Sequence, residues 1–185
     1  WSFNCFFVND MYVELFDEGD VRNMFHWDSG LNVHYFDKFY DNAELSGDFV
    51  FMRADEMLLN KAEALAQLGN NAEALAALNQ LRTLRGESES MKGGKALLDE
   101  IYAERKRELY GEGFAWYDLR REQKPLLREG MHNNFSGGKP MPANSWRFVY
   151  QIPSTEIVNN PNISSDFWPN GDQNPFGEPD QYILQ

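Results

Sequence analysis

Between residues 53 and 85 the apolar positions recur three or four residues apart, as the buried face of an amphipathic helix requires. In the first half of this stretch they are Ala54, Met57, Leu58, Ala62, Leu65 and Leu68, and in the second half Ala74, Leu75, Leu78, Leu81 and Leu84. Gly69 and two asparagines separate the halves, since glycine accepts the left-handed conformation that ends a helix and asparagine can cap the next. The pattern predicts an αα-hairpin the size of a tetratricopeptide repeat, with a positive φ at Gly69.

Two more helices are predicted beyond a polar linker at residues 87–94. The third helix covers about 95–110, and its inward positions are Leu97, Leu98, Ile101, Tyr102, Arg105 and Leu109. Gly111 and Gly113 interrupt the pattern before a fourth helix at 114–122. We expect this pair to form a second, degenerate hairpin packed against the first.

The segments on either side of the helices lack this periodicity. Residues 1–52 are rich in aromatic side chains, and a short helix is expected near 10–17, followed by irregular or extended chain. All eight prolines lie at or beyond Pro125, which predicts loops and short elements in residues 123–185. The chain is therefore predicted to be mainly α, with tetratricopeptide-like helical hairpins at 53–122, long irregular loops and little β structure.

Charge and composition exclude several classes of protein. Seventeen basic residues against 29 acidic ones give a net charge of −12. Nucleic-acid binding needs a basic surface, so we expect no nucleic-acid partner, and anionic membrane surfaces should repel the chain. No apolar run is long enough for a transmembrane segment. The one cysteine, Cys5, excludes an internal disulfide and a cysteine-rich metal site.

The densest polar cluster lies in the third helix, from Glu104 to Glu108. Its glutamates recur every four residues and share one helix face, and two carboxylates about 5–5.5 Å apart could serve a retaining glycosidase. Arg105 and Arg107 are interleaved with them, however, and would lower the pKa values that a general acid needs to have raised. We therefore interpret Glu104, Arg105, Arg107 and Glu108 as a structural ion-pair network and expect no catalytic residue. Glycoside hydrolysis remains a weaker alternative.

The sequence contains no recognisable metal or cofactor site. The spacing of His26, His34 and His132 fits no zinc motif. The segment that begins at Asp172 starts like a calcium loop, but Phe176 stands where an oxygen ligand belongs. No glycine-rich phosphate loop is present, so we expect neither a metal nor a cofactor.

The remaining candidates for binding are aromatic residues in polar, turn-like surroundings. Trp1, Trp27, Tyr35 and Trp168 have such surroundings, and Trp27 precedes a run of Asp, Ser and Gly. Rigid aromatic faces stack on sugar rings, bases or peptide side chains at small entropy cost. We expect Trp27 and Tyr35, and then Trp1, to contact a ligand.

Several motifs, taken in order, resemble the C-terminal half of the SusD/RagB family. The motifs that carry the resemblance are Asp20-Val21-Arg22, Tyr35-Phe36-Asp37-Lys38-Phe39, residues 53–65, Leu78-Asn79-Gln80-Leu81-Arg82, residues 101–109, Glu112-Gly113, residues 116–121, Ile152-Pro153-Ser154-Thr155-Glu156-Ile157 and Asn160-Pro161-Asn162. Each motif is weak by itself, and their common order and spacing make the likeness specific.

The resemblance implies a SusD-like α-α superhelix with a loop-rich ligand surface and no catalysis. Such proteins hold an oligosaccharide, or sometimes a peptide, above a SusC-like TonB-dependent transporter. They lie at the surface of the outer membrane, anchored by a lipid on an N-terminal segment that these 185 residues lack. In the family, Glu104, Arg105 and Glu108 match scaffold positions. The alternative is a tetratricopeptide-like protein–protein interaction module with the αα-hairpin as its peptide groove.

Overall fold

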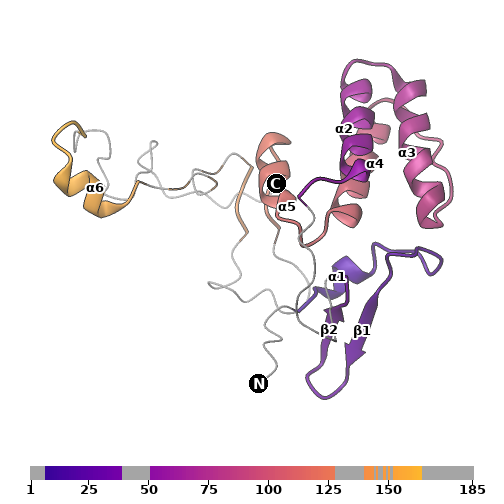
Figure 1. Ribbon diagram of the computed structural model, residues 1–185, viewed down its shortest axis with the longest axis horizontal. Helices are drawn as coiled ribbons and strands as arrows, with labels where there is room; N and C mark the ends of the chain where they lie inside the picture. Colours follow the sequence, from indigo (N-terminus) through magenta and orange to yellow (C-terminus); the bar gives the residue numbers. More distant parts are fainter. Residues whose placement is uncertain are drawn as a thin grey trace. The chain divides into compact units, whose positions relative to one another are not determined.

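A computed structural model of the chain describes residues 7–38, 51–127, 140–143, 145, 148, 150 and 152–163 (Figure 1). These residues fall into two compact units, one ending at Phe114 and the other beginning at Ala115. The elements are α1 (Asp10–Val13), β1 (Phe25–Asp28), β2 (Val33–Phe36), α2 (Ala54–Gln67), α3 (Asn71–Arg85), α4 (Gly94–Glu108), α5 (Phe114–Arg121) and α6 (Ser154–Asn159). The prediction of a mainly helical fold with little β structure is confirmed.

The turn between α2 and α3 forms as the glycine pattern predicts. Gly69 has a φ of +81°, and its N–H donates to the carbonyl of Ala66 at 3.1 Å. The N–H of Asn70 donates to the carbonyl of Leu65 at 2.9 Å. Two such bonds around a left-handed residue satisfy carbonyls that the helix end would otherwise leave unpaired.

Helices α2, α3 and α4 lie side by side and enclose the core of the first unit (Figure 1). The fully enclosed apolar side chains are Leu59, Ala62, Ala74, Ala77, Leu78, Leu81, Leu97 and Ile101. The alanines let the backbones approach closely, and α4 covers the inner face of the hairpin. The inward positions predicted for α4 are confirmed, because all of them are buried or half-buried.

The apolar stripes predicted for α2 and α3 are wrong at their edges. Met57, Leu68 and Leu84 are 50%, 76% and 62% exposed. Helix α2 contacts both α3 and α4, and its buried side centres on Leu59, which the predicted stripe omits, and Ala62, which it includes. Spacing alone does not distinguish these two registers, because they share several positions.

The first 38 residues hold a β-hairpin that the sequence pattern did not predict. Strands β1 and β2 pair antiparallel, with Trp27 opposite His34 and His26 opposite Tyr35. Asp28 closes the turn, since its Oδ1 accepts hydrogen bonds from the N–H groups of Gly30 and Leu31 at 2.8 and 3.1 Å. Turns of this kind are a usual role for aspartate.

An aromatic cluster joins the hairpin to the end of α4. Tyr12 stacks on Tyr110 with ring centroids 4.2 Å apart, and Phe25 stacks on Phe36 at 4.8 Å. The hydroxyl of Tyr12 also donates to the carbonyl of Lys106 at 2.6 Å. Many of the aromatic side chains in the first 40 residues therefore pack against one another and are not available to bind a ligand.

The second unit contains α5 and α6. Trp116 on α5 packs against Phe148 with ring centroids 4.8 Å apart, and Leu126 pairs with Met141 through two backbone hydrogen bonds of 2.9 Å. Within the described part of the chain, no helix has the length and apolar character needed to cross a membrane. Cys5, His132 and the segment that begins at Asp172 lie outside the described residues.

Candidate functional site

A buried ion-pair network surrounds the guanidinium group of Arg22, which lies on the segment between α1 and β1 and contacts α4. Its Nη2 lies 2.7 Å from carboxylate oxygens of both Asp20 and Glu87. Its Nη1 lies 2.7 Å from Glu104 and 2.9 Å from Glu108. All five side chains are at most 9% exposed, so one arginine holds four carboxylates away from water.

Other arginines complete the pairing of these carboxylates. Arg85 contacts Glu108 at 2.8 Å, and Arg82 contacts Glu87 and Glu104 at 2.6 and 3.3 Å. Further pairs join Arg53 to Glu108 and Arg107 to Glu104. Glu87, Glu104 and Glu108 thus each have several cationic partners, which offset the cost of removing their charges from water.

Of the four residues predicted to form an ion-pair network, three contact the groups around Arg22 and the fourth, Arg105, contacts α2. Glu104, Arg107 and Glu108 lie among the carboxylates and arginines around Arg22. Arg105 is buried too, but its guanidinium donates to Oδ1 of Asn60 on α2 at 2.6 Å. It therefore ties α4 to α2 instead of to the hairpin.

Most partners in this network cannot be identified from local sequence patterns, because they are distant along the chain. Arg22 is 82 and 86 residues from Glu104 and Glu108. The only available signal was that Asp20 and Arg22 belong to one of the motifs that carry the family resemblance. Lys38 belongs to another, and its Nζ donates to the carbonyl of Glu108 at 2.8 Å, at the negative end of α4.

The electrostatics of the network do not suit acid catalysis. Burial alone would raise the pKa of Glu108, but the hydrogen bond from Arg85 and the charges of neighbouring arginines lower it below its usual value. A general acid needs a raised pKa, so Glu108 is unsuited to that role. Glu87 behaves differently, because burial, a hydrogen bond with Asp20 and the charge of Glu104 raise its pKa to about 7.

The raised pKa of Glu87 predicts a specific dependence of stability on pH. A carboxyl with a higher pKa in the folded state than in the unfolded state stabilises the fold below the unfolded pKa, and this contribution disappears as pH rises through 7. Between pH 6 and 8 the loss should be about 1 kcal/mol. Urea unfolding of the parent and of Glu87→Gln at both pH values measures it. The difference in unfolding free energy between the two proteins should change by that amount, and parallel pH profiles would contradict the assignment.

The exposed part of the hairpin carries Trp27. Its side chain is 44% exposed, and its ring lies 4.6 Å from that of His34, its cross-strand partner, at an angle of 58°. Phe25, two residues earlier on the same face, belongs to the aromatic cluster. Trp27 thus offers an aromatic face to solvent from a strand that packing fixes in place.

The expected exposure of Tyr35 is wrong. Its side chain is only 8% exposed, and its ring contacts Phe7 at 5.7 Å and stacks on His26 at 5.1 Å. Because side chains alternate along a strand, Tyr35 shares its face with Val33, which is 2% exposed. The two other aromatic candidates, Trp1 and Trp168, lie outside the described residues.

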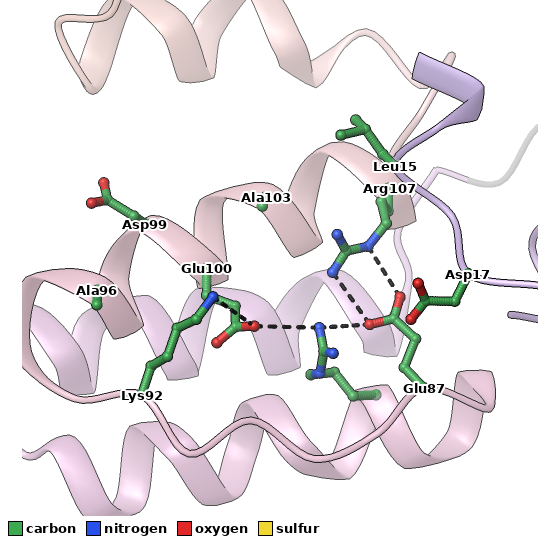
Figure 2. Close-up of a pocket in the computed structure, with 10 residues that line it drawn as sticks. Leu15, Asp17, Glu87, Lys92, Ala96, Asp99, Glu100, Ala103 and Arg107 are labelled. Atoms are coloured by element: carbon green, nitrogen blue, oxygen red, sulfur yellow. Dashed lines mark hydrogen bonds and ion pairs between the residues drawn. The ribbon is translucent and has the colours of Figure 1, made fainter. Parts of the chain in front are cut away.

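A polar pocket of about 400 Å³ opens beside the ion-pair network (Figure 2). The residues that line it are Leu15, Asp17, Arg82, Glu87, Lys92, Ala96, Asp99, Glu100, Ala103 and Arg107. Alternating charges run along one wall, where Lys92 contacts Glu100 at 3.3 Å and Arg107 contacts Glu87 at 3.1 Å. Arg82 bridges the two glutamates, at 3.7 Å from Glu100 and 2.6 Å from Glu87. Among the described residues, no group of acidic, histidine or cysteine side chains is arranged to hold a metal ion.

The sequence is similar to that of proteins in the SusD family. The sequence model of that family matches residues 10–175. A curated relative, SusD-like protein P38 of Formosa agariphila, is 29% identical over 129 residues, which make up 64% of this chain and 24% of the relative. The chain thus spans about a quarter of the length of this curated relative.

Solved structures show the same likeness in three dimensions. A SusD-like carbohydrate binding protein from Bacteroides vulgatus has a TM-score of 0.73 and 30% identity, over 87% of this chain and 42% of that one. A SusD homolog from Bacteroides thetaiotaomicron has a TM-score of 0.63 and 30% identity, over 84% of this chain and 37% of that one. The chain therefore spans less than half the length of either protein.

Proposed function

Because the chain belongs to the SusD family, we propose that it binds a glycan, or another polymer-derived nutrient, without cleaving it. The observation that carries this proposal is that Trp27 is 44% exposed on a strand that the aromatic cluster holds in place. In that cluster, Phe25 of the same strand stacks on Phe36 of β2. An aromatic side chain binds a sugar more tightly when it is already fixed in place, because binding then does not lose the entropy of ordering it. The similar protein from Bacteroides vulgatus, described as carbohydrate binding, supports a sugar as the ligand.

The absence of turnover is part of the proposal and has its own support. Glu104 and Glu108 are the two glutamates that an acid–base pair would need. Both pair with Arg22, and their side chains are at most 2% exposed. Neither carboxylate is accessible to a substrate, and the arginines around Glu108 lower its pKa below the range that a general acid needs. These glutamates instead support the fold that presents Trp27.

Delivery to a SusC-like TonB-dependent transporter in the outer membrane is the finer part of the proposal. It rests on family membership. The alternative, a tetratricopeptide-like peptide-binding module, has less support, since α4 occupies the inner face of the α2–α3 hairpin. Affinity purification of the full-length gene product from outer membranes should recover such a transporter with it, and recovery of cytoplasmic proteins alone would favour the alternative.

Trp27→Ala is expected to weaken glycan binding about 2- to 10-fold. A stacked ring contributes roughly 0.5–1.5 kcal/mol beyond its buried area, and its loss removes that contribution. The side chain is 44% exposed, so the variant should keep its fold. Isothermal titration calorimetry with an oligosaccharide that binds the parent measures the effect.

A matched control comes from the second unit of the chain. Tyr117 is 64% exposed on α5, and Tyr117→Ala removes an exposed aromatic ring of comparable size. This control should bind as the parent does. Equal affinities of the parent and Trp27→Ala would remove Trp27 from the proposed site.

A further inference from the structure

The pocket of Figure 2 has the features of a second binding site, separate from Trp27. Three stretches of chain form it: the segment after α1, the end of α3 with the loop that follows, and one face of α4. Its volume of about 400 Å³ lies in the range of small-molecule sites. We propose that this pocket binds one neutral sugar unit, as a second subsite of the glycan-binding function proposed above, on which the inference rests.

The polar wall of the pocket is fixed before any ligand arrives. Arg82 and Glu87 are each 8% exposed, and both are held by ion pairs on more than one side. Glu100 accepts a hydrogen bond from the hydroxyl of Ser90 as well as contacting Lys92. A ligand that meets these groups does not have to order them, which lowers the entropic cost of binding.

The floor of the pocket includes small apolar side chains of α4. Ala96 and Ala103 lie two turns apart on α4, on the same face as Glu100 and Arg107 (Figure 2). Their methyl groups leave room that larger side chains would fill, and Leu15 adds apolar surface from the segment after α1. A sugar ring has an apolar C–H face and a rim of hydroxyls, so it can rest on the alanines and bond to the wall.

The charges of the pocket select against anionic sugars. Its lining includes three cationic side chains (Arg82, Lys92, Arg107) and four acidic ones (Asp17, Glu87, Asp99, Glu100), a formal charge of −1. The cations are already engaged by acids of the same wall, and the whole chain carries −12. A neutral hydroxyl can both donate and accept, so it can bond to paired arginines and glutamates without breaking the pairs.

Methyl NMR of the alanine-labelled chain tests this inference at the floor of the pocket. Glucose, galactose, mannose and xylose are the neutral probes, and galacturonate is the anionic one. At least one neutral sugar should shift the methyl signals of both Ala96 and Ala103 saturably, while that of Ala72, which lies outside the pocket, stays in place. The indole N–H of Trp27 reports the first site in the same samples.

Two variants separate the pocket from the Trp27 site. Ala96→Leu fills the floor at an exposed position, so it should fold normally and abolish the shift at Ala103. Trp27→Ala should leave both methyl shifts unchanged. Circular dichroism checks that each variant is folded.

Each other outcome contradicts a defined part of the account. A response at Trp27 with no shift at either alanine would overturn the pocket and leave the proposed function intact. No response at either place to any probe would overturn both. Equal shifts with galacturonate would overturn the assignment of a neutral ligand.

Discussion

Replacing Arg22 with leucine is expected to lower the unfolding free energy by about 3–5 kcal/mol, since removing one partner of a buried ion pair leaves the others uncompensated. Arg22 lies within 2.9 Å of four carboxylates, each at most 3% exposed. Its removal leaves a surplus of buried negative charge against α4. Urea unfolding followed by circular dichroism measures the loss.

An exposed arginine provides the control for this variant. The side chain of Arg121 is 40% exposed and contacts Asp118 at 2.8 Å. Arg121→Leu removes a close partner of one carboxylate, that of Asp118, instead of four, and should cost about 1 kcal/mol, since the arginine of this pair is open to water. If Arg22→Leu were as mild as this control, the network would not stabilise the fold.

Gly86→Ala should be the most damaging change at any helix end in the first unit. Gly86 ends α3 with a φ of +84°, which costs a residue with a β-carbon about 1–2 kcal/mol. A β-carbon here would also lie 2.5 Å from the carbonyl oxygen of Gly19. Relieving that overlap requires backbone movement, which adds about 1–3 kcal/mol.

Gly69→Ala separates the two causes of this loss. Gly69 has nearly the same φ, +81°, but a β-carbon there would meet nothing within 4 Å. Its unfolding free energy should therefore fall only by the conformational cost. Equal losses for Gly69→Ala and Gly86→Ala, measured by the same urea unfolding, would show that the approach of Gly19 has no energetic consequence.

The helical part of the fold was predictable because its information is local. Apolar spacing and glycine breaks place α2, α3, α4 and α5 close to their observed bounds. The stripes fail at Ala54, Met57, Leu68 and Leu84, which are exposed, because the choice of buried side depends on which helices lie alongside. That choice is made by tertiary contacts and leaves no local trace.

The β-hairpin was not predicted because its strands are short and unusual. Each has four residues, and β1 has an exposed centre at His26 and Trp27 instead of alternating burial. The turn carries its left-handed residue at Asn32 (φ +57°) and not at a glycine. Unless the β-hairpin is known, the sequence does not show that Tyr35 lies on its buried face and Trp27 on its exposed face.

The ion-pair network was predictable only in part, for a related reason. The interleaved charges of α4 indicate pairing, but their main partner, Arg22, lies more than 80 residues away. The motifs that resemble the SusD/RagB family include Arg22, Lys38 and Glu108, which meet at one end of α4. The family resemblance is therefore strongest in the scaffold, and it does not identify the ligand-binding side chains.

The central claim is that this chain binds a glycan and leaves it intact. The most direct test incubates the chain with a panel of plant, host and microbial oligosaccharides and follows bound ligand and released reducing ends in the same samples. The account predicts saturable binding of at least one oligosaccharide, with reducing ends constant over time. Steady release of reducing ends, or the absence of binding across the whole panel, would contradict it.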